Sequence, residues 1–197
     1  MNAEDAEKKV ILRGPRQFKR LFVSKNSGTL KINPQQIAVG GDSAGGNLAA
    51  AISLMARDTG GPAISFQLLI YPATDQRLSH PSIDSNGEGY LLTKKVMQYF
   101  RGHYLPREAD LLDWRASPLL AKSLSKLPPA FVMTAGYDPL RDEGKAYADR
   151  MSKEGVKVEY KNYADMVHGF ITMGRVLETT STALADCAQA LKGAWGK

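Results

Sequence analysis

The sequence predicts an α/β fold in which a mostly parallel sheet carries helices on both faces. Short apolar segments alternate with helical patterns, and the first two apolar segments enclose one helix within residues 37–71, which is a βαβ unit. The 197 residues, 43% of them hydrophobic, are enough for one domain with its own core. The predicted strands cover residues 37–39, 64–71, 130–135 and 156–160, and the predicted helices after them run to about residue 57 and over 140–153 and 181–195.

Breaks in the chain set the bounds of the first elements. A helix is predicted over Pro15 to Asn26, because apolar and basic side chains fall on opposite faces. Asn33-Pro34 then interrupts the chain before the first strand, and Gly60-Gly61-Pro62 ends the helix that follows it. The strand over 156–160 alternates apolar and polar residues, which is typical of a strand at a sheet edge.

A long irregular insertion separates the second and third strands. The pattern over 75–127 is irregular: residues 75–89 are polar and rich in turns, and a helix that Thr93 would cap is predicted over 93–103. Long insertions between core strands are usually lids or binding elements, so we interpret 75–127 as a partial cap.

Composition narrows the classes of protein. Cys187 is the only cysteine, which excludes an intrachain disulfide and favours a reducing, cytoplasmic location. No apolar run is long enough to cross a membrane, so no stable membrane insertion is expected. The basic segment 1–31 carries most of the net charge of +6. Such a segment can contact nucleic acid or anionic lipid, but we interpret it as a solvated helix face and expect no nucleic-acid partner.

The turn after the first strand contains the pattern Gly41-x-Ser43-x-Gly45. In a nucleophile elbow, glycines relieve the crowding of a strained strand-to-helix turn, so that the serine hydroxyl projects from the sheet. A glycine-rich turn that holds a phosphate at a helix N-terminus is the alternative. The absence of a lysine from this turn argues against it.

A serine nucleophile needs a base, and three histidines are candidates. His80 lies in the insertion and His103 at the end of its helix, whereas His168 follows the fourth strand. Functional groups of open α/β sheets gather at the carboxyl ends of the strands, which favours His168.

The acid that orients the base should follow another strand. Asp138 comes directly after the third strand, with Asp142 and Asp165 as alternatives. Asp138-Pro139 is also a good helix N-terminus, and one aspartate can serve both purposes through different oxygens. The chain order serine, aspartate, histidine is that of α/β-hydrolases.

Three motifs together resemble the bacterial hormone-sensitive-lipase-like family of carboxylesterases and lipases. They are the elbow over 40–47, the run Asp138-Pro139-Leu140-Arg141-Asp142-Glu143 and the run His168-Gly169-Phe170. The resemblance extends from about residue 32 to the C-terminus, so we expect 32–197 to be the catalytic domain, with 75–127 as its cap insertion.

The resemblance implies an α/β-hydrolase that cleaves small-molecule or lipid esters through an acyl-enzyme, without a cofactor or metal. By the same resemblance Ser43 is the nucleophile, His168 the general acid and base, Asp138 its orienter, and the Ala44 amide an oxyanion donor.

One family feature is missing from the sequence. The His-Gly-Gly loop that supplies further oxyanion donors should precede the elbow, yet no such segment occurs. We therefore expect a truncated α/β-hydrolase whose first strand is an exposed edge, which favours a homo-oligomer. A non-catalytic ligand-binding relative and an acyltransferase remain as alternative functions.

Overall fold

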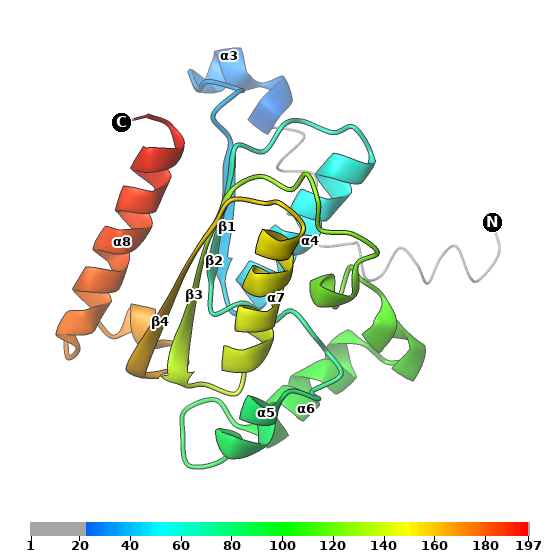
Figure 1. The fold of residues 1–197 in the computed structure, drawn as a ribbon, viewed down its shortest axis with the longest axis vertical. Helices are drawn as coiled ribbons and strands as arrows, with labels where there is room; N and C mark the ends of the chain where they lie inside the picture. Colours follow the sequence, from blue (N-terminus) through cyan, green and yellow to red (C-terminus); the bar gives the residue numbers. More distant parts are fainter. Residues whose placement is uncertain (1–22, 197) are drawn as a thin grey trace.

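The computed structural model describes residues 23–196 and forms a sheet with helices on both faces (Figure 1). The strands are β1 (Ala38–Asp42), β2 (Phe66–Ile70), β3 (Ala130–Tyr137) and β4 (Val158–Val167). The α-helices are α3 (Ser27–Leu30), α4 (Ala44–Asp58), α5 (Pro81–Ser85), α6 (Lys94–Tyr104), α7 (Arg141–Lys153) and α8 (Glu178–Ala194). Three short 3-10 turns cover Glu108–Leu112, Pro118–Leu120 and Phe170–Thr172.

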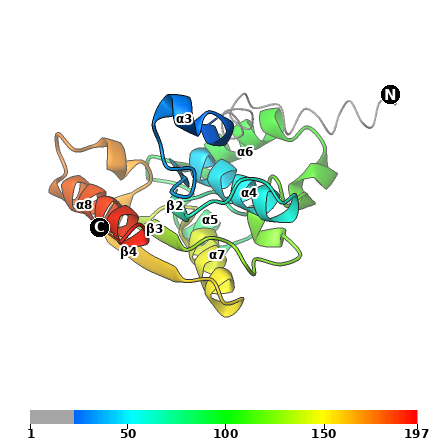
Figure 2. The same cartoon turned by 90° about the horizontal axis from the view of Figure 1, so that it is seen from above.

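The four strands lie in the order β1-β2-β3-β4, and every neighbouring pair is parallel. Seen from above, α4 and α7 cover one face of the sheet and α8 covers the other (Figure 2). Because side chains alternate along a strand, Val132 packs with the α4 and α7 side, while Phe131 and Met133 pack toward α8. The predicted fold class is thus confirmed, with β4 at one edge.

The structure extends three of the predicted strands, β3 among them as far as Tyr137. β1 continues through Gly40 and Gly41, which pair with Leu68 and Leu69 of β2. An added Cβ on Gly40 would lie only 3.0 Å from the Leu68 Cβ, so a glycine suits this close strand contact. β4 continues to Val167 because it pairs with β3 as far as Tyr137, across an irregularity after Ala135.

Differences at the helix ends are small. Thr93 caps α6 as predicted, with its hydroxyl accepting a hydrogen bond from the Val96 amide at 3.2 Å. The last helix begins at Glu178, three residues before its predicted start at 181. Residues 23–25 of the helix predicted over 15–26 are helical, and residues 15–22 lie outside the described part of the chain.

Segments from the insertion over 75–127 lie beside the carboxyl ends of the strands. Figure 1 shows α5 and α6 at this end of the sheet, below the arrowheads of β3 and β4. Ser43, Asp138 and His168 all lie in turns that follow a strand at the same end. The fold therefore brings together side chains that are far apart in the sequence.

Candidate active site

Ser43 lies in a strained turn between β1 and α4. Its backbone has φ 54° and ψ −118°, a conformation that non-glycine residues rarely adopt. The Ser43 amide donates to the Ile70 carbonyl at 2.9 Å, and the Ser43 carbonyl accepts from the Asn47 amide at 3.1 Å. These bonds hold the serine between the end of the sheet and the first turn of α4.

The glycines around Ser43 are not equivalent. An added Cβ on Gly41 would lie 2.5 Å from the carbonyl carbon of Gly45, and one on Gly46 would lie 2.8 Å from the Pro72 Cβ. A Cβ on Gly45 would meet only the Asp42 Oδ1 atom, at 3.8 Å. Steric crowding therefore requires glycine at positions 41 and 46. At Gly45, the last glycine of the Gly-x-Ser-x-Gly pattern, an added Cβ would meet no close contact.

Ser43, His168 and Asp138 form one chain of hydrogen bonds. The His168 Nε2 atom is 2.9 Å from the Ser43 Oγ, and its Nδ1 atom is 2.7 Å from the Asp138 Oδ2. An ionised carboxylate only accepts, so Nδ1 carries the proton and Nε2 is left to accept from the serine hydroxyl. The three residues thus meet in the arrangement that a serine nucleophile requires.

Asp138 also organises the start of the next helix. Its side chain is fully buried, and its Oδ1 atom accepts from the Leu140 amide at 2.8 Å while Oδ2 faces His168. The aspartate thus contacts both the histidine and the start of the helix, each through its own oxygen. The Leu140 bond holds the carboxylate in the orientation that His168 needs.

The other histidines and acidic candidates lie elsewhere. His80 Nε2 is 3.3 Å from Asp75 Oδ2, and the His103 ring packs against Tyr99. Asp142 pairs with Arg141 and accepts from the Ser82 amide at 2.9 Å. Asp165 is an exposed residue of β4.

Ala44 is the first residue of α4 and is exposed to solvent. The first amides of a helix have no acceptor within it and lie at its positive end. The Ala44 amide is therefore available to a negatively charged oxygen that forms beside Ser43.

Comparisons with known proteins agree with this geometry. A family model described as the alpha/beta hydrolase fold matches residues 18–172, so the match begins within the basic segment 1–31. The chain belongs to the hormone-sensitive-lipase-like family of α/β-hydrolases.

Characterised members of the family share much of this α/β-hydrolase chain. Carboxylesterase NlhH of Mycobacterium tuberculosis is 41% identical over 177 residues, which cover 88% of this chain and 55% of the relative. Ethyl acetate hydrolase of Pseudomonas putida is 37% identical over 174 residues, covering 87% of this chain and 54% of the relative. The chain thus spans about half the length of these curated relatives.

A crystal structure shows the same fold. The α/β-hydrolase LAE6, from the metagenome of Lake Arreo in Spain, is 44% identical and superposes with a TM-score of 0.86. The match covers 89% of this chain and 56% of LAE6.

Two side chains beside the triad were missed by sequence reasoning. Asn47 is buried on α4, and its Nδ2 atom donates to the Ala73 and Ala116 carbonyls, each at 2.7 Å. Tyr71 is fully buried with an unusual φ of 33°, and its ring centroid lies 4.6 Å from that of His168. Burial raises the pKa of Tyr71, and the Asp42 and Asp138 charges add to this effect, so the phenol stays neutral.

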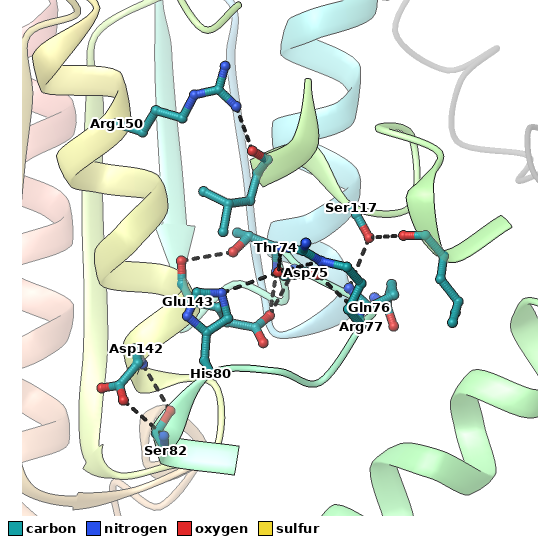
Figure 3. A network of polar contacts seen from close by, with 12 residues as sticks. Thr74, Asp75, Gln76, Arg77, His80, Ser82, Ser117, Asp142, Glu143 and Arg150 are labelled. Carbon is teal, nitrogen blue, oxygen red and sulfur yellow. Dashed lines mark hydrogen bonds and ion pairs between the residues drawn. The ribbon is translucent and has the colours of Figure 1, made fainter. Parts of the chain in front are cut away.

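A polar network joins the turn after β2 to α7 (Figure 3). Burial alone would raise the pKa of Asp75, but hydrogen bonds from Arg77 and His80 outweigh it and hold the pKa far below its ordinary value. The pKa of Glu143 shifts in the opposite direction to that of Asp75 and rises to about 8, with burial as the largest cause. Sequence patterns predict neither state, since acidic residues in a turn and in a first helical turn are usually solvated.

The described residues contain neither a candidate metal site nor a candidate membrane-spanning helix. Between residues 23 and 196 no group of three or more histidine, cysteine, aspartate or glutamate side chains is placed to hold a metal ion. Over the same residues, no helix has the length and apolar character that a membrane crossing requires.

Proposed function

We propose that the protein hydrolyses carboxylic esters through an acyl-enzyme formed on Ser43. The observation that carries the proposal is the continuous set of hydrogen bonds from Ser43 through His168 to Asp138. The carboxylesterase and ethyl acetate hydrolase named above support esters as the substrate class.

The first half of the reaction forms the acyl-enzyme. The Ser43 Oγ atom attacks the ester carbonyl carbon while its proton moves to His168 Nε2. Asp138 stabilises the imidazolium through Nδ1, and the Ala44 amide faces the developing oxyanion. When the tetrahedral intermediate collapses, the carbon–oxygen bond to the alcohol breaks and the leaving oxygen takes the proton from Nε2.

The second half repeats these steps with water. Water loses a proton to Nε2 and attacks the acyl carbon, and Ser43 leaves with that proton as the acid is released. Because Ala44 is the one oxyanion donor that we assign, esters with a good leaving group should react best. Removing a single donor from an oxyanion hole costs on the order of 10²–10³ in rate.

Covalent labelling with a fluorophosphonate tests the nucleophile. The wild type should be labelled and Ser43→Ala should not, because the Ser43 Oγ atom displaces fluoride from phosphorus. Ser53→Ala is a matched control, since Ser53 is a buried serine of α4 whose hydroxyl bonds the Ala49 carbonyl at 2.9 Å. Equal labelling of wild type and Ser43→Ala would refute the assignment.

The acid is tested by Asp138→Asn. The asparagine oxygen can keep the Leu140 bond, but its amide cannot accept the His168 Nδ1 proton, which favours the wrong tautomer. We expect p-nitrophenyl acetate hydrolysis to fall by on the order of 10³–10⁴. A loss below tenfold would exclude Asp138 as the orienter.

Labelling, together with product analysis in the presence of an alcohol, separates ester hydrolysis from the two alternative functions, which are non-catalytic binding and acyl transfer. A non-catalytic binding relative would leave the fluorophosphonate unreacted. An acyltransferase would give mainly the new ester when an alcohol is added, whereas a hydrolase gives mainly the free acid.

A further inference from the structure

Glu143 connects two turns that each hold part of the active site. Its carboxyl is fully buried, and its Oε1 atom accepts from the Thr74 amide at 2.7 Å and the Asp75 amide at 3.1 Å. The Thr74 hydroxyl donates in return to the Glu143 carbonyl at 2.9 Å. Figure 3 shows these bonds between the turn after β2 and helix α7.

One end of this connection is the Ser43 turn. Ala73, the neighbour of Thr74, donates its amide to the Ser43 carbonyl at 3.3 Å. The Ala73 carbonyl accepts from the Asn47 side chain, and Pro72 packs against Gly46 on α4. The segment 72–75 therefore lies directly on the elbow that presents the serine.

The other end is the Asp138 turn. The Asp138 carbonyl accepts from the Arg141 amide at 3.1 Å, and its Oδ1 atom accepts from Leu140, so the aspartate is tied to the start of α7. Glu143 is in the first turn of the same helix. A shift of α7 relative to the segment 72–75 would therefore change the distance from the serine to the histidine and aspartate.

Burial and the neighbouring negative charges favour the uncharged form of the Glu143 carboxyl, whereas its two amide contacts favour the charged form. The net pKa is raised to about 8, with burial as the largest cause and the negative charges of Asp75 and Asp138 adding to it. No salt bridge to Glu143 occurs within residues 23–196, and its Oε2 atom has no hydrogen-bond partner there. Since Oε1 accepts two amide hydrogens, the proton belongs on Oε2.

We propose that Glu143 is a positioning residue, whose buried carboxyl holds the segment 72–75 against α7 and thereby sets the distance between Ser43 and the His168–Asp138 pair. This inference rests on the proposed function of those three residues. It adds that activity falls when Glu143 ionises at alkaline pH, because a third buried carboxylate then lies beside Asp75 and Asp138.

Two substitutions at Glu143 separate charge from contact. Glu143→Gln keeps an acceptor oxygen for the two amides and cannot ionise, whereas Glu143→Ala removes the contact. Asp142→Asn is the matched control, because the neighbouring carboxylate bonds Ser82 and Arg141 instead of the segment 72–75. Thermal unfolding of each variant shows whether it is folded at the assay temperature.

The readout is the pH profile of kcat and KM with p-nitrophenyl acetate. Above the pKa of Glu143, kcat of the wild type and of Asp142→Asn should fall about tenfold per pH unit, with KM little changed. Glu143→Gln should match the wild type at neutral pH and lack this decline. Glu143→Ala should have a lower kcat than the wild type at every pH, whereas Glu143→Gln should keep the wild-type kcat at neutral pH. An identical alkaline limb in wild type and Glu143→Gln, or an unchanged kcat in Glu143→Ala, would overturn the proposal.

A second readout does not depend on turnover. If neither ester cleavage nor fluorophosphonate labelling occurs in the wild type, the proposed function fails. The positioning role is then read from the imidazole NMR signals of His168, assigned with His168→Asn. Glu143→Ala should shift them while Asp142→Asn should not, and no shift with Glu143→Ala would overturn the role.

Discussion

The elbow glycines predict opposite results for Gly41→Ala and Gly45→Ala, although both changes break the same sequence pattern. The methyl group at 41 would lie 2.5 Å from the Gly45 carbonyl carbon and 2.6 Å from its oxygen, and these are backbone atoms that cannot rotate away. Either α4 or the Ser43 turn must move, and overpacking of this kind costs about 3 kcal/mol.

The methyl group at 45 has space. Its nearest neighbour beyond the adjoining backbone of α4 is the Asp42 Oδ1 atom at 3.8 Å, which is an ordinary contact distance, and Gly45 does not have a positive φ. Replacement of glycine by alanine inside a helix stabilises by about 0.5–1 kcal/mol, because the unfolded chain loses freedom. The two variants should therefore differ by about 4 kcal/mol in free energy of unfolding.

Thermal and urea unfolding measure this difference. For a chain of this size, 1 kcal/mol shifts Tm by about 2–4 °C, so Gly41→Ala should unfold about 10 °C below Gly45→Ala. Fluorophosphonate labelling should follow the same order, with Gly45→Ala close to wild type. If Gly45→Ala is as unstable as Gly41→Ala, or if Gly41→Ala is as stable as wild type, the steric account of the elbow is wrong.

Three further predictions concern the surroundings of the site. Asn47→Ala should cost about 2–3 kcal/mol in urea unfolding, because the buried Ala116 carbonyl and the half-buried Ala73 carbonyl lose their donor. Ser53→Ala on the same helix should cost less than about 1 kcal/mol, and equal costs for the two variants would contradict this account. Because folding lowers the pKa of Asp75, its ionised carboxylate stabilises the fold above the unfolded pKa, and this contribution is lost as the pH falls. Arg77→Ala, which removes the partner of Asp75, should therefore be less stable than wild type at neutral pH. A stability difference that persists in strong acid would refute the coupling between Arg77 and Asp75. β1 pairs only with β2 among the described strands, so light scattering should detect an oligomer or aggregates as concentration rises, and a monomer at high concentration would exclude pairing through this edge.

Glu143 also predicts how stability depends on pH. Because burial raises its pKa from 4.5 to about 8, the folded state keeps a proton that the unfolded chain has lost between these values. The contribution is fully present below the unfolded pKa and declines as the pH rises to about 8, by on the order of 4–5 kcal/mol in total. Glu143→Gln should remove this part of the dependence in urea titrations across the interval. Parallel curves for wild type and Glu143→Gln would contradict it.

Much of this fold could be predicted from local sequence. Apolar, β-branched segments bounded by glycine and proline mark β2 and β3, and Thr93 marks the start of α6 through a contact within its own first turn. The positions of Ser43, Asp138 and His168 after strands also follow from the chain, because parallel strands end at one edge of the sheet. These features depend on neighbours in sequence or on the rules of α/β connection.

Other features required the assembled structure. The polar residues near the end of β4 gave no strand signal, and the strand continues because Tyr163 pairs with Ala135 and packs in the core under α8. The need for glycine at 46, instead of 45, comes from Pro72, which belongs to a different element. Long-range packing of this kind has no local signature.

The same reason separates the two acidic residues in the first turn of α7. By sequence alone, Asp142 and Glu143 are adjacent carboxylates in a first helical turn, where both complement the helix dipole. Only the fold buries Glu143 against Thr74 and Asp75 while Asp142 keeps Arg141 as a partner. The sequence by itself determined which groups could carry the chemistry, and the tertiary structure decided their distances and charges, because burial and hydrogen bonding depend on residues far away along the chain.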